Sequence, residues 1–189
     1  MPDASGGLDR AGNVLGAVAL AVVDRITEAV ATTTAQPESA AAALSALHFF
    51  IQRPSIDTLR RVLGLTSSGT VRLVDRLERD GLVTRRAGDD ARTTFVVLTP
   101  AGQRAAARVA QARAGVLVDA LTLLSPRERA ELDLLVGKIA VGMMREPGAV
   151  RWTCRLCDTD VCGRYEGRCP IGNAAERKPG ATMNVAERP

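Results

Sequence analysis

The four cysteines of the chain lie together in one short stretch near its C-terminal end. They are Cys154, Cys157, Cys162 and Cys169, spaced C-x2-C-x4-C-x6-C within 16 residues. Core packing does not readily explain this concentration of cysteine, whereas four thiolates in one loop can surround a metal centre. Thiolate suits the role because it is a soft donor that is deprotonated on binding. We therefore predict a metal site with these four cysteines as ligands.

Two kinds of centre compete for the four thiolates. A zinc ion would be held tetrahedrally by all four, but zinc sites often use two paired knuckles, and only Cys154 and Cys157 have that spacing. An iron–sulfur cluster tolerates unequal spacing, and Cys169 followed by Pro170 is similar to the ending of bacterial ferredoxin runs. The spacing favours an iron–sulfur cluster slightly over Zn²⁺. Redox-active thiols or disulfides without a metal are the third interpretation.

A second set of candidate residues is a row of arginines on a short predicted helix. Arg72, Arg76 and Arg79 recur at i, i+4 and i+7, opposite the apolar residues of that helix. A cationic helix face can meet phosphates and base edges in the major groove of DNA. The other interpretation is a solvated face, whose arginines pair with acidic residues nearby. Those acidic residues are Asp75, Glu78 and Asp80.

The elements that would carry these arginines are a helix-turn-helix and a hairpin. Two segments of helical periodicity flank Gly64, and glycine accepts the left-handed backbone of the tight turn between them. Residues 82–87 and 93–98 then read as antiparallel strands around the turn signal Gly88-Asp89-Asp90. Arginine near a hairpin tip can enter the minor groove of DNA. The arginines predicted there are Arg85, Arg86 and Arg92.

The order of these residues resembles the MarR family of bacterial transcriptional regulators. The matching stretches are Leu73–Val83, Arg85-Arg86, Asp90–Arg92 and Leu98–Gly102. The resemblance implies a winged helix-turn-helix in which Asp90 holds the hairpin tip and Arg92 enters the minor groove. It also implies that helix positions Ser67, Ser68 and Arg72 face DNA. The full set of predicted DNA-binding residues is Ser67, Ser68, Arg72, Arg76, Arg85, Arg86, Asp90 and Arg92.

Long helices are predicted on both sides of the reader. Helical periodicity covers residues 8–32, before the reader, and 37–51, at its start. The cap signal at Thr99 begins a helix of about 25 residues, and the cap signal at Ser125 begins a helix that runs to about Glu146. Such helices need a partner surface, which predicts a homodimer whose two readers match a palindromic operator. The expected regions are a dimerisation helix (1–36), the reader (37–98), dimerisation helices (99–146), the metal loop (147–170) and a disordered tail (171–189).

Composition sets wider limits on the function. The chain has 189 residues, 46% of them hydrophobic, and its net charge of +4 permits nucleic-acid binding without establishing it. The sequence has neither an apolar run of 18 residues nor a signal-peptide pattern, so we expect no membrane span and a cytoplasmic location. It also lacks a phosphate loop, a nucleophile elbow and a His–carboxylate constellation, which argues against an enzyme.

The prediction is therefore a mainly α, winged helix-turn-helix transcriptional regulator that binds double-stranded DNA, and a repressor in particular. We expect the cysteine centre to modulate it by repositioning the last long helix and hence the spacing of the two readers. A small-molecule or redox effector is a further expected partner, with a pocket between the reader and the dimer helices. The alternative is an electron-transfer or assembly protein containing iron–sulfur or zinc, which would leave the basic wing without a purpose.

Overall fold

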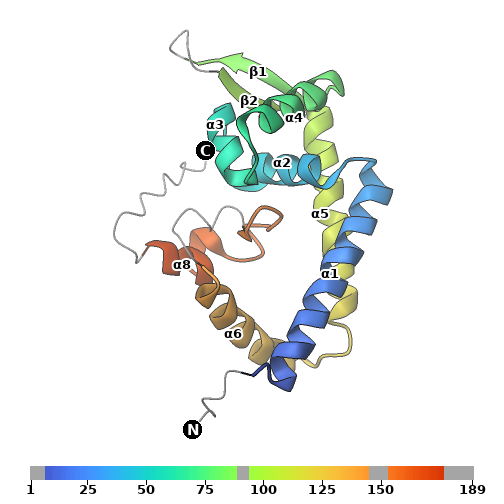
Figure 1. Cartoon of the computed structure of the whole chain (residues 1–189), viewed down its shortest axis with the longest axis vertical. Coiled ribbons are helices and arrows are strands. Elements are labelled where there is room, and N and C mark those ends of the chain that lie inside the picture. The colour runs from blue at the N-terminus through green and yellow to red at the C-terminus, as the bar shows by residue number, and fades with distance from the viewer. Residues whose placement is uncertain (1–6, 89–93, 145–152, 177–189) are drawn as a thin grey trace.

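The chain folds into a mainly helical structure with one two-stranded sheet, which confirms the predicted fold class. The computed structural model describes residues 7–88, 94–144 and 153–176. In these residues the elements are α1 (Arg10–Thr34), α2 (Glu38–Phe49), α3 (Ile56–Leu63), α4 (Ser67–Arg79), β1 (Val83–Ala87), β2 (Thr94–Leu98), α5 (Pro100–Ala120), α6 (Pro126–Gly142), the 3₁₀ turn η1 (Arg164–Glu166) and α8 (Pro170–Glu176). The reader (37–98), which comprises α2, α3, α4 and the hairpin, occupies one end of the molecule and α6 the other (Figure 1). Among the described helices, none is long and apolar enough to cross a membrane.

The turn between α3 and α4 depends on Gly64, as predicted. Gly64 has φ 63° and ψ 27°, in the left-handed region, and its N–H donates to the carbonyl of Arg60. α4 then begins with Thr66 as its cap, because the Thr66 hydroxyl accepts a hydrogen bond from the Gly69 N–H at 3.1 Å. The helix-turn-helix geometry is therefore set by local signals.

The two strands of the wing pair in antiparallel register, with Val83 opposite Leu98 and Ala87 opposite Thr94. The hairpin is also tied to the chain that leads into α3, because the Val96 N–H donates to the Pro54 carbonyl at 2.9 Å. These contacts place the hairpin beside the reader helices. Residues 89–93, which contain most of the predicted turn, lie outside the described residues.

The wing meets the long helices at a very close contact. Thr99 caps α5 by accepting from the Gly102 N–H at 3.0 Å, and its hydroxyl donates to the Gly81 carbonyl at 2.6 Å. A Cβ atom on Gly102 would lie 1.9 Å from the carbonyl oxygen of Leu82. Only glycine therefore permits α5 to begin against the wing in this way.

The core of the reader is built around α2. Residues 40–46 of this helix are all buried, as expected for a helix whose small and apolar residues cover every face. α2 packs against α5, α3, α4 and β2. Leu59, Val74 and Leu77 of the neighbouring helices are fully buried against it. The position of α2 therefore affects α3, α4 and β2 of the reader directly.

The long helices form the rest of the molecule, and α1 packs along α5. α5 ends at Ala120 after 21 residues, earlier than the predicted length of about 25 residues. α6 begins with the predicted capping box of Ser125 and Glu128, and it ends at Gly142. The predicted helix end near Glu146 lies outside the described residues. None of the α6 residues is buried within the single chain.

The residues after the last cysteine differ from the prediction. The sequence predicts disorder from residue 171, but residues up to 176 belong to α8, which packs against α6. The physical reason is a small apolar cluster, in which Ala175 is buried together with Met144 and Cys154. The remainder of the predicted tail, 177–189, is outside the described residues.

Candidate nucleic-acid interface and cysteine segment

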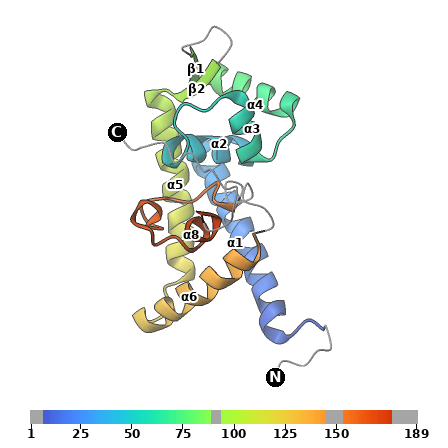
Figure 2. The ribbon, with the colours of Figure 1, turned by 90° about the vertical axis from the view of Figure 1, so that its left-hand side faces the viewer.

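α4 turns the predicted DNA-binding residues to its outer side. Its inner face is buried and consists of Thr70, Leu73, Val74 and Leu77. The exposed residues of α4 include Ser67, Ser68, Arg72 and Arg76. The structure thus brings together the four helix residues that the sequence selects, at the end of the molecule that also carries the wing (Figure 2).

The arginines of this surface form few ion pairs with acidic residues. Arg72 and Arg86 are exposed and make no ion pair within the described part of the chain. Arg76 approaches Asp80 at 3.9 Å, and its side chain remains 51% exposed. A surface pair of this length contributes little to stability. These three guanidinium groups are therefore available to phosphate or to base edges.

Arg85 differs from the other arginines because it joins the wing to α4. Its guanidinium donates to Asp75 at 2.5 Å and also to Glu78, and its backbone N–H donates to Glu78 at 3.0 Å. Partial burial alone would lower the pKa of Arg85, but the hydrogen bonds to the two carboxylates outweigh it and raise that pKa. Asp75 and Glu78 thus form their ion pairs with Arg85 and not with the arginines of α4. Sequence reasoning missed this pairing, since it links an α4 face to a strand.

Two of the predicted wing residues, Asp90 and Arg92, fall outside the described residues. The strands that lead to them are described: β1 packs beside α4, and β2 pairs with β1. Their DNA-binding roles stay predictions, as do the roles of the other interface residues.

The four cysteines lie in one neighbourhood within residues 153–176, here termed the cysteine segment. Their thiols hydrogen-bond in two pairs, Cys154 with Cys157 and Cys162 with Cys169. The two pairs also influence each other's ionisation, since Cys169 raises the pKa of Cys154 and Cys157 raises that of Cys162. Cys154 and Cys169 are buried, and the N–H of Gly172 donates to the Cys169 sulfur at 3.3 Å.

The thiols have strongly different acidities in this arrangement. The hydrogen bond from Cys154 lowers the pKa of Cys157 to about 6, against the effect of burial, with help from the positive charges of Arg113 and Arg164. Burial, followed by the contact with Cys169, raises the pKa of Cys162 to about 12. Across the described residues, no three His, Cys, Asp or Glu side chains are arranged so that they could hold a metal ion. The predicted metal centre stays a prediction.

The cysteine segment docks on the body of the protein. Arg155 pairs with Glu38 at the start of α2, at 3.6 Å. The hydroxyls of Thr159 and Tyr165 both donate to the carbonyl of Phe49 at the end of α2, at 3.0 and 3.4 Å. Sequence reasoning missed these contacts, because no local pattern links residues more than one hundred positions apart. In Figure 2 the segment lies between the reader and α6.

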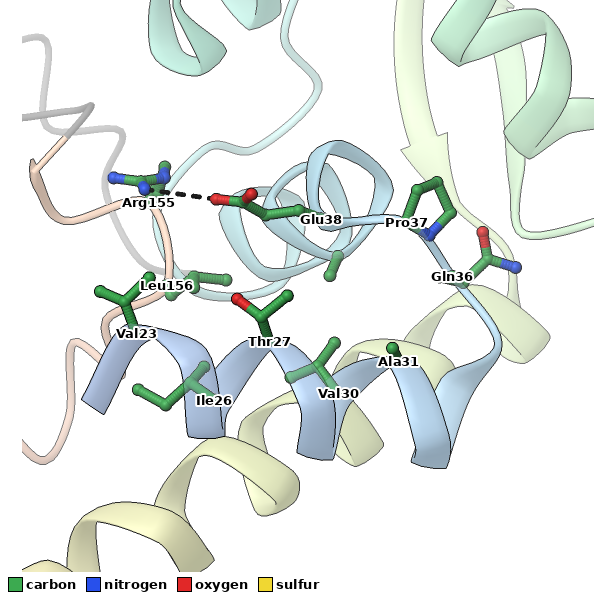
Figure 3. A pocket seen from close by; sticks show the side chains of 11 residues that line it. Val23, Ile26, Thr27, Val30, Ala31, Gln36, Pro37, Glu38, Arg155 and Leu156 are labelled. Carbon is green, nitrogen blue, oxygen red and sulfur yellow. Dashed lines mark ion pairs between the residues drawn. The ribbon is translucent and has the colours of Figure 1, made fainter. Parts of the chain in front are cut away.

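An apolar pocket lies where the cysteine segment meets α1 and the start of α2. Its volume is about 220 Å³, and Figure 3 shows Val23, Ile26 and Val30 of α1 along one side with Leu156 across from them. The ion pair of Arg155 and Glu38 lies at its edge (Figure 3). No aromatic residue lines it. The pocket suits a small apolar molecule.

Comparisons with known proteins agree with this geometry. Residues 37–93 match the model of the MarR family. A MarR family protein from Bacillus stearothermophilus is 25% identical, with a TM-score of 0.60 over 69% of this chain and 91% of that one. Sco3205, a MarR family transcriptional regulator from Streptomyces coelicolor in complex with DNA, is 21% identical, with a TM-score of 0.56 over 73% and 91%. CouR from Rhodococcus jostii bound to p-coumaroyl-CoA is 20% identical, with a TM-score of 0.53 over 75% and 100%. No curated protein matches the chain.

Proposed function

Because residues 37–93 match the model of the MarR family, we propose that this chain is a transcriptional regulator that binds double-stranded DNA through α4 and the wing and acts as a repressor. The observation that carries the proposal is the exposed arginine surface, in which Arg72, Arg76 and Arg86 lie at the wing end of the molecule. Sco3205, which has the same fold, is in complex with DNA. A repressor would act by occupying its operator and excluding the transcription machinery.

The proposed active form is a homodimer. α6 has no buried residue in the single chain, although it carries a run of apolar side chains. Leu134, Leu135 and Val136 are 67%, 57% and 46% exposed. Apolar surface of this extent favours association. A two-fold dimer would present two readers to the two halves of a palindromic operator and would add their phosphate contacts.

A small apolar effector is a further part of the proposal. The structure of CouR contains p-coumaroyl-CoA, so a protein of this fold can bind a small molecule. In this chain the pocket beside α1 and α2 is the candidate site, with Val30 and Leu156 among its lining residues. A volume of about 220 Å³ is below the usual range of drug-sized sites, about 300–1,000 Å³. The effector would therefore be small.

A second proposal concerns the four cysteines, which would hold a metal centre and modulate DNA binding. Its support is that four thiols from one segment lie next to each other, two of them buried. Binding would require the two thiol pairs to close on one centre, since they do not form a cage as they stand. Metal and sulfide analysis of anaerobically purified protein tests this proposal. Iron with sulfide would identify a cluster and zinc a single ion, whereas protein without stoichiometric metal would refute it.

The DNA-binding proposal is tested by selecting binding sequences from random duplexes with the purified full chain. We expect a palindromic site whose affinity falls steeply with salt, because phosphate contacts release counterions. Replacing Arg92, the predicted wing arginine, by alanine should weaken binding while the circular dichroism spectrum stays unchanged. Absence of sequence enrichment, or an affinity independent of salt, would favour the electron-transfer alternative.

A further inference from the structure

α2 differs from the other long helices because it has no side-chain cap of its own. The helices α1, α3, α4, α5 and α6 each begin with a hydroxyl or carboxylate that accepts a hydrogen bond from the first turn; these caps are Asp9, Ser55, Thr66, Thr99 and Ser125. α2 begins after Pro37, which offers no such group. The free N–H and C=O groups at helix ends need partners, and contacts from outside the helix can supply them at its C-terminal end.

The cysteine segment supplies contacts at both ends of α2. At the N-terminal end, Arg155 pairs with Glu38, the first residue of the helix. At the C-terminal end, the hydroxyls of Thr159 and Tyr165 donate to the carbonyl of Phe49, the last residue of the helix. A carbonyl at a helix end has no partner within the helix, and these two hydroxyls provide one. Two groups of the cysteine segment thus complete the C-terminal end of α2.

Between these two ends, Leu156 packs against the core. It contacts the cluster that contains Leu59 and Leu77 of the reader, and also the cluster of Val30 and Val109 where α1 meets α5. One side chain of the segment therefore touches both the reader core and the long-helix core. The cysteine segment spans α2 from end to end.

We propose that the cysteine segment is a clamp on α2. Whether its four thiols are free or engaged in the proposed metal centre would then set DNA affinity through the position of this helix. The proposal rests on the proposed function, since it concerns regulation of the same reader. It differs from the route predicted from the sequence, which ran through the last long helix and the spacing of two readers. The clamp acts inside one subunit, because α2 packs directly against α3 and α4.

The contacts of the clamp differ in strength. Thr159 is 4% exposed, so its hydrogen bond to Phe49 lies away from solvent, and its loss would leave a carbonyl without this partner. The Arg155–Glu38 pair is more exposed, with side chains 24% and 58% accessible, and such pairs contribute little. Thr159 is therefore the residue through which the clamp is best tested, and Arg155 should have the smaller effect.

The first experiment measures operator affinity of Thr159→Val, which keeps the side-chain shape and removes the hydroxyl. We expect a loss of about three- to tenfold, because one buried hydrogen bond to α2 is lost. Thr159→Ser keeps the hydroxyl and should restore most of the affinity. Thr122→Val is the matched control, because the Thr122 hydroxyl, just after α5, donates to the nearby Asp119 carbonyl in the last turn of that helix and does not touch α2. A loss of thermal stability in Thr159→Val with unchanged affinity would overturn the clamp.

The second experiment tests whether the thiols act through the same contact. A Cys154→Ser, Cys169→Ser double variant should lower affinity by a similar factor, and adding Thr159→Val should lower it no further, since both changes release the same helix. Hydrogen exchange should be faster in α2 in each variant, with α1 as the internal reference. Fully additive losses, or unchanged exchange in α2, would refute the proposal. If the wild-type chain binds no DNA, the proposed function fails while hydrogen exchange still reports on the clamp.

Discussion

The reader and the cysteine segment are held together by different means. The reader encloses several fully buried side chains of its own, among them Leu59, Val74 and Leu77. The cysteine segment has only a small cluster, in which Cys154 and Ala175 are buried with Met144 from the chain after α6. Short segments with so little core usually need a staple such as a metal or disulfide. The reader therefore has a core of its own, whereas the cysteine segment is held largely by its contacts with α2.

The largest expected effect tests whether the reader is supported by its own core. Leu77→Ala should lower the free energy of unfolding by about 2–5 kcal/mol, because Leu77 is fully buried and its removal leaves a cavity. Ile171→Ala, in the partly buried cluster of the cysteine segment, should lower it far less. Urea unfolding followed by circular dichroism measures both changes. Leu123→Ala is the control, because that side chain is 94% exposed. Equal losses of unfolding free energy in the Leu77 and Ile171 variants would contradict the difference between the two cores.

The next effect concerns the exposed surface of the reader. Arg72→Ala should weaken operator binding by about 1–3 kcal/mol if the arginine contacts a base, or reduce the salt slope by about one if it contacts a phosphate. The free energy of unfolding should not change, since Arg72 is exposed and has no ion pair among the described residues. Arg127→Ala removes the same charge from α6, where the side chain is 89% exposed, and should leave DNA binding as it is.

A smaller effect separates two neighbouring arginines of the wing. Arg85→Ala should lower the free energy of unfolding by about 1 kcal/mol, because the ion pairs from β1 to Asp75 and Glu78 are partly exposed. Arg86→Ala should leave stability unchanged and weaken DNA binding instead, since Arg86 is exposed. Thermal unfolding and fluorescence anisotropy with labelled operator measure the two outcomes. A stability loss at Arg86 equal to that at Arg85 would contradict this division of roles.

The smallest effect sharpens the description of the cysteine segment through pH. Thiolate, not thiol, reacts with iodoacetamide, and the pKa of Cys157 is lowered to about 6 from an ordinary value of 9.0. In metal-free protein the alkylation of Cys157 should therefore rise as pH increases through about 6. Cys162, with a pKa raised to about 12, should stay unreactive at the same pH. Peptide mass spectrometry after short exposure measures both, and equal labelling of the two would contradict the pairing of the thiols.

Local signals made the reader predictable. The turn at Gly64, the cap at Thr66 and the exposed arginines of α4 each depend on neighbours a few residues away, and all three occur where the sequence places them. The pairing of Arg85 with Asp75 and Glu78 was not predictable in this way, because the same carboxylates could equally have served the arginines of α4. Spacing along the chain does not decide between such partners.

The cysteine segment was predictable in composition but not in position. The sequence identifies four candidate ligands, yet nothing near Thr159 or Leu156 indicates contact with α2. These contacts join residues that only the folded chain brings together. α8 was missed for a related reason, since Ala175 is buried by packing against distant residues and not by any helical pattern of its own.

The contact at Gly102 has a consequence for how the whole reader is oriented. The space between this residue and the Leu82 carbonyl admits a hydrogen atom and nothing larger. Any side chain at position 102 would push the wing away from α5. In the proposed dimer it would change the angle at which each reader approaches DNA. The orientation of the reader on α5 thus depends on the absence of a side chain at one position, and saturation mutagenesis of Gly102 should return glycine alone among variants that keep operator binding.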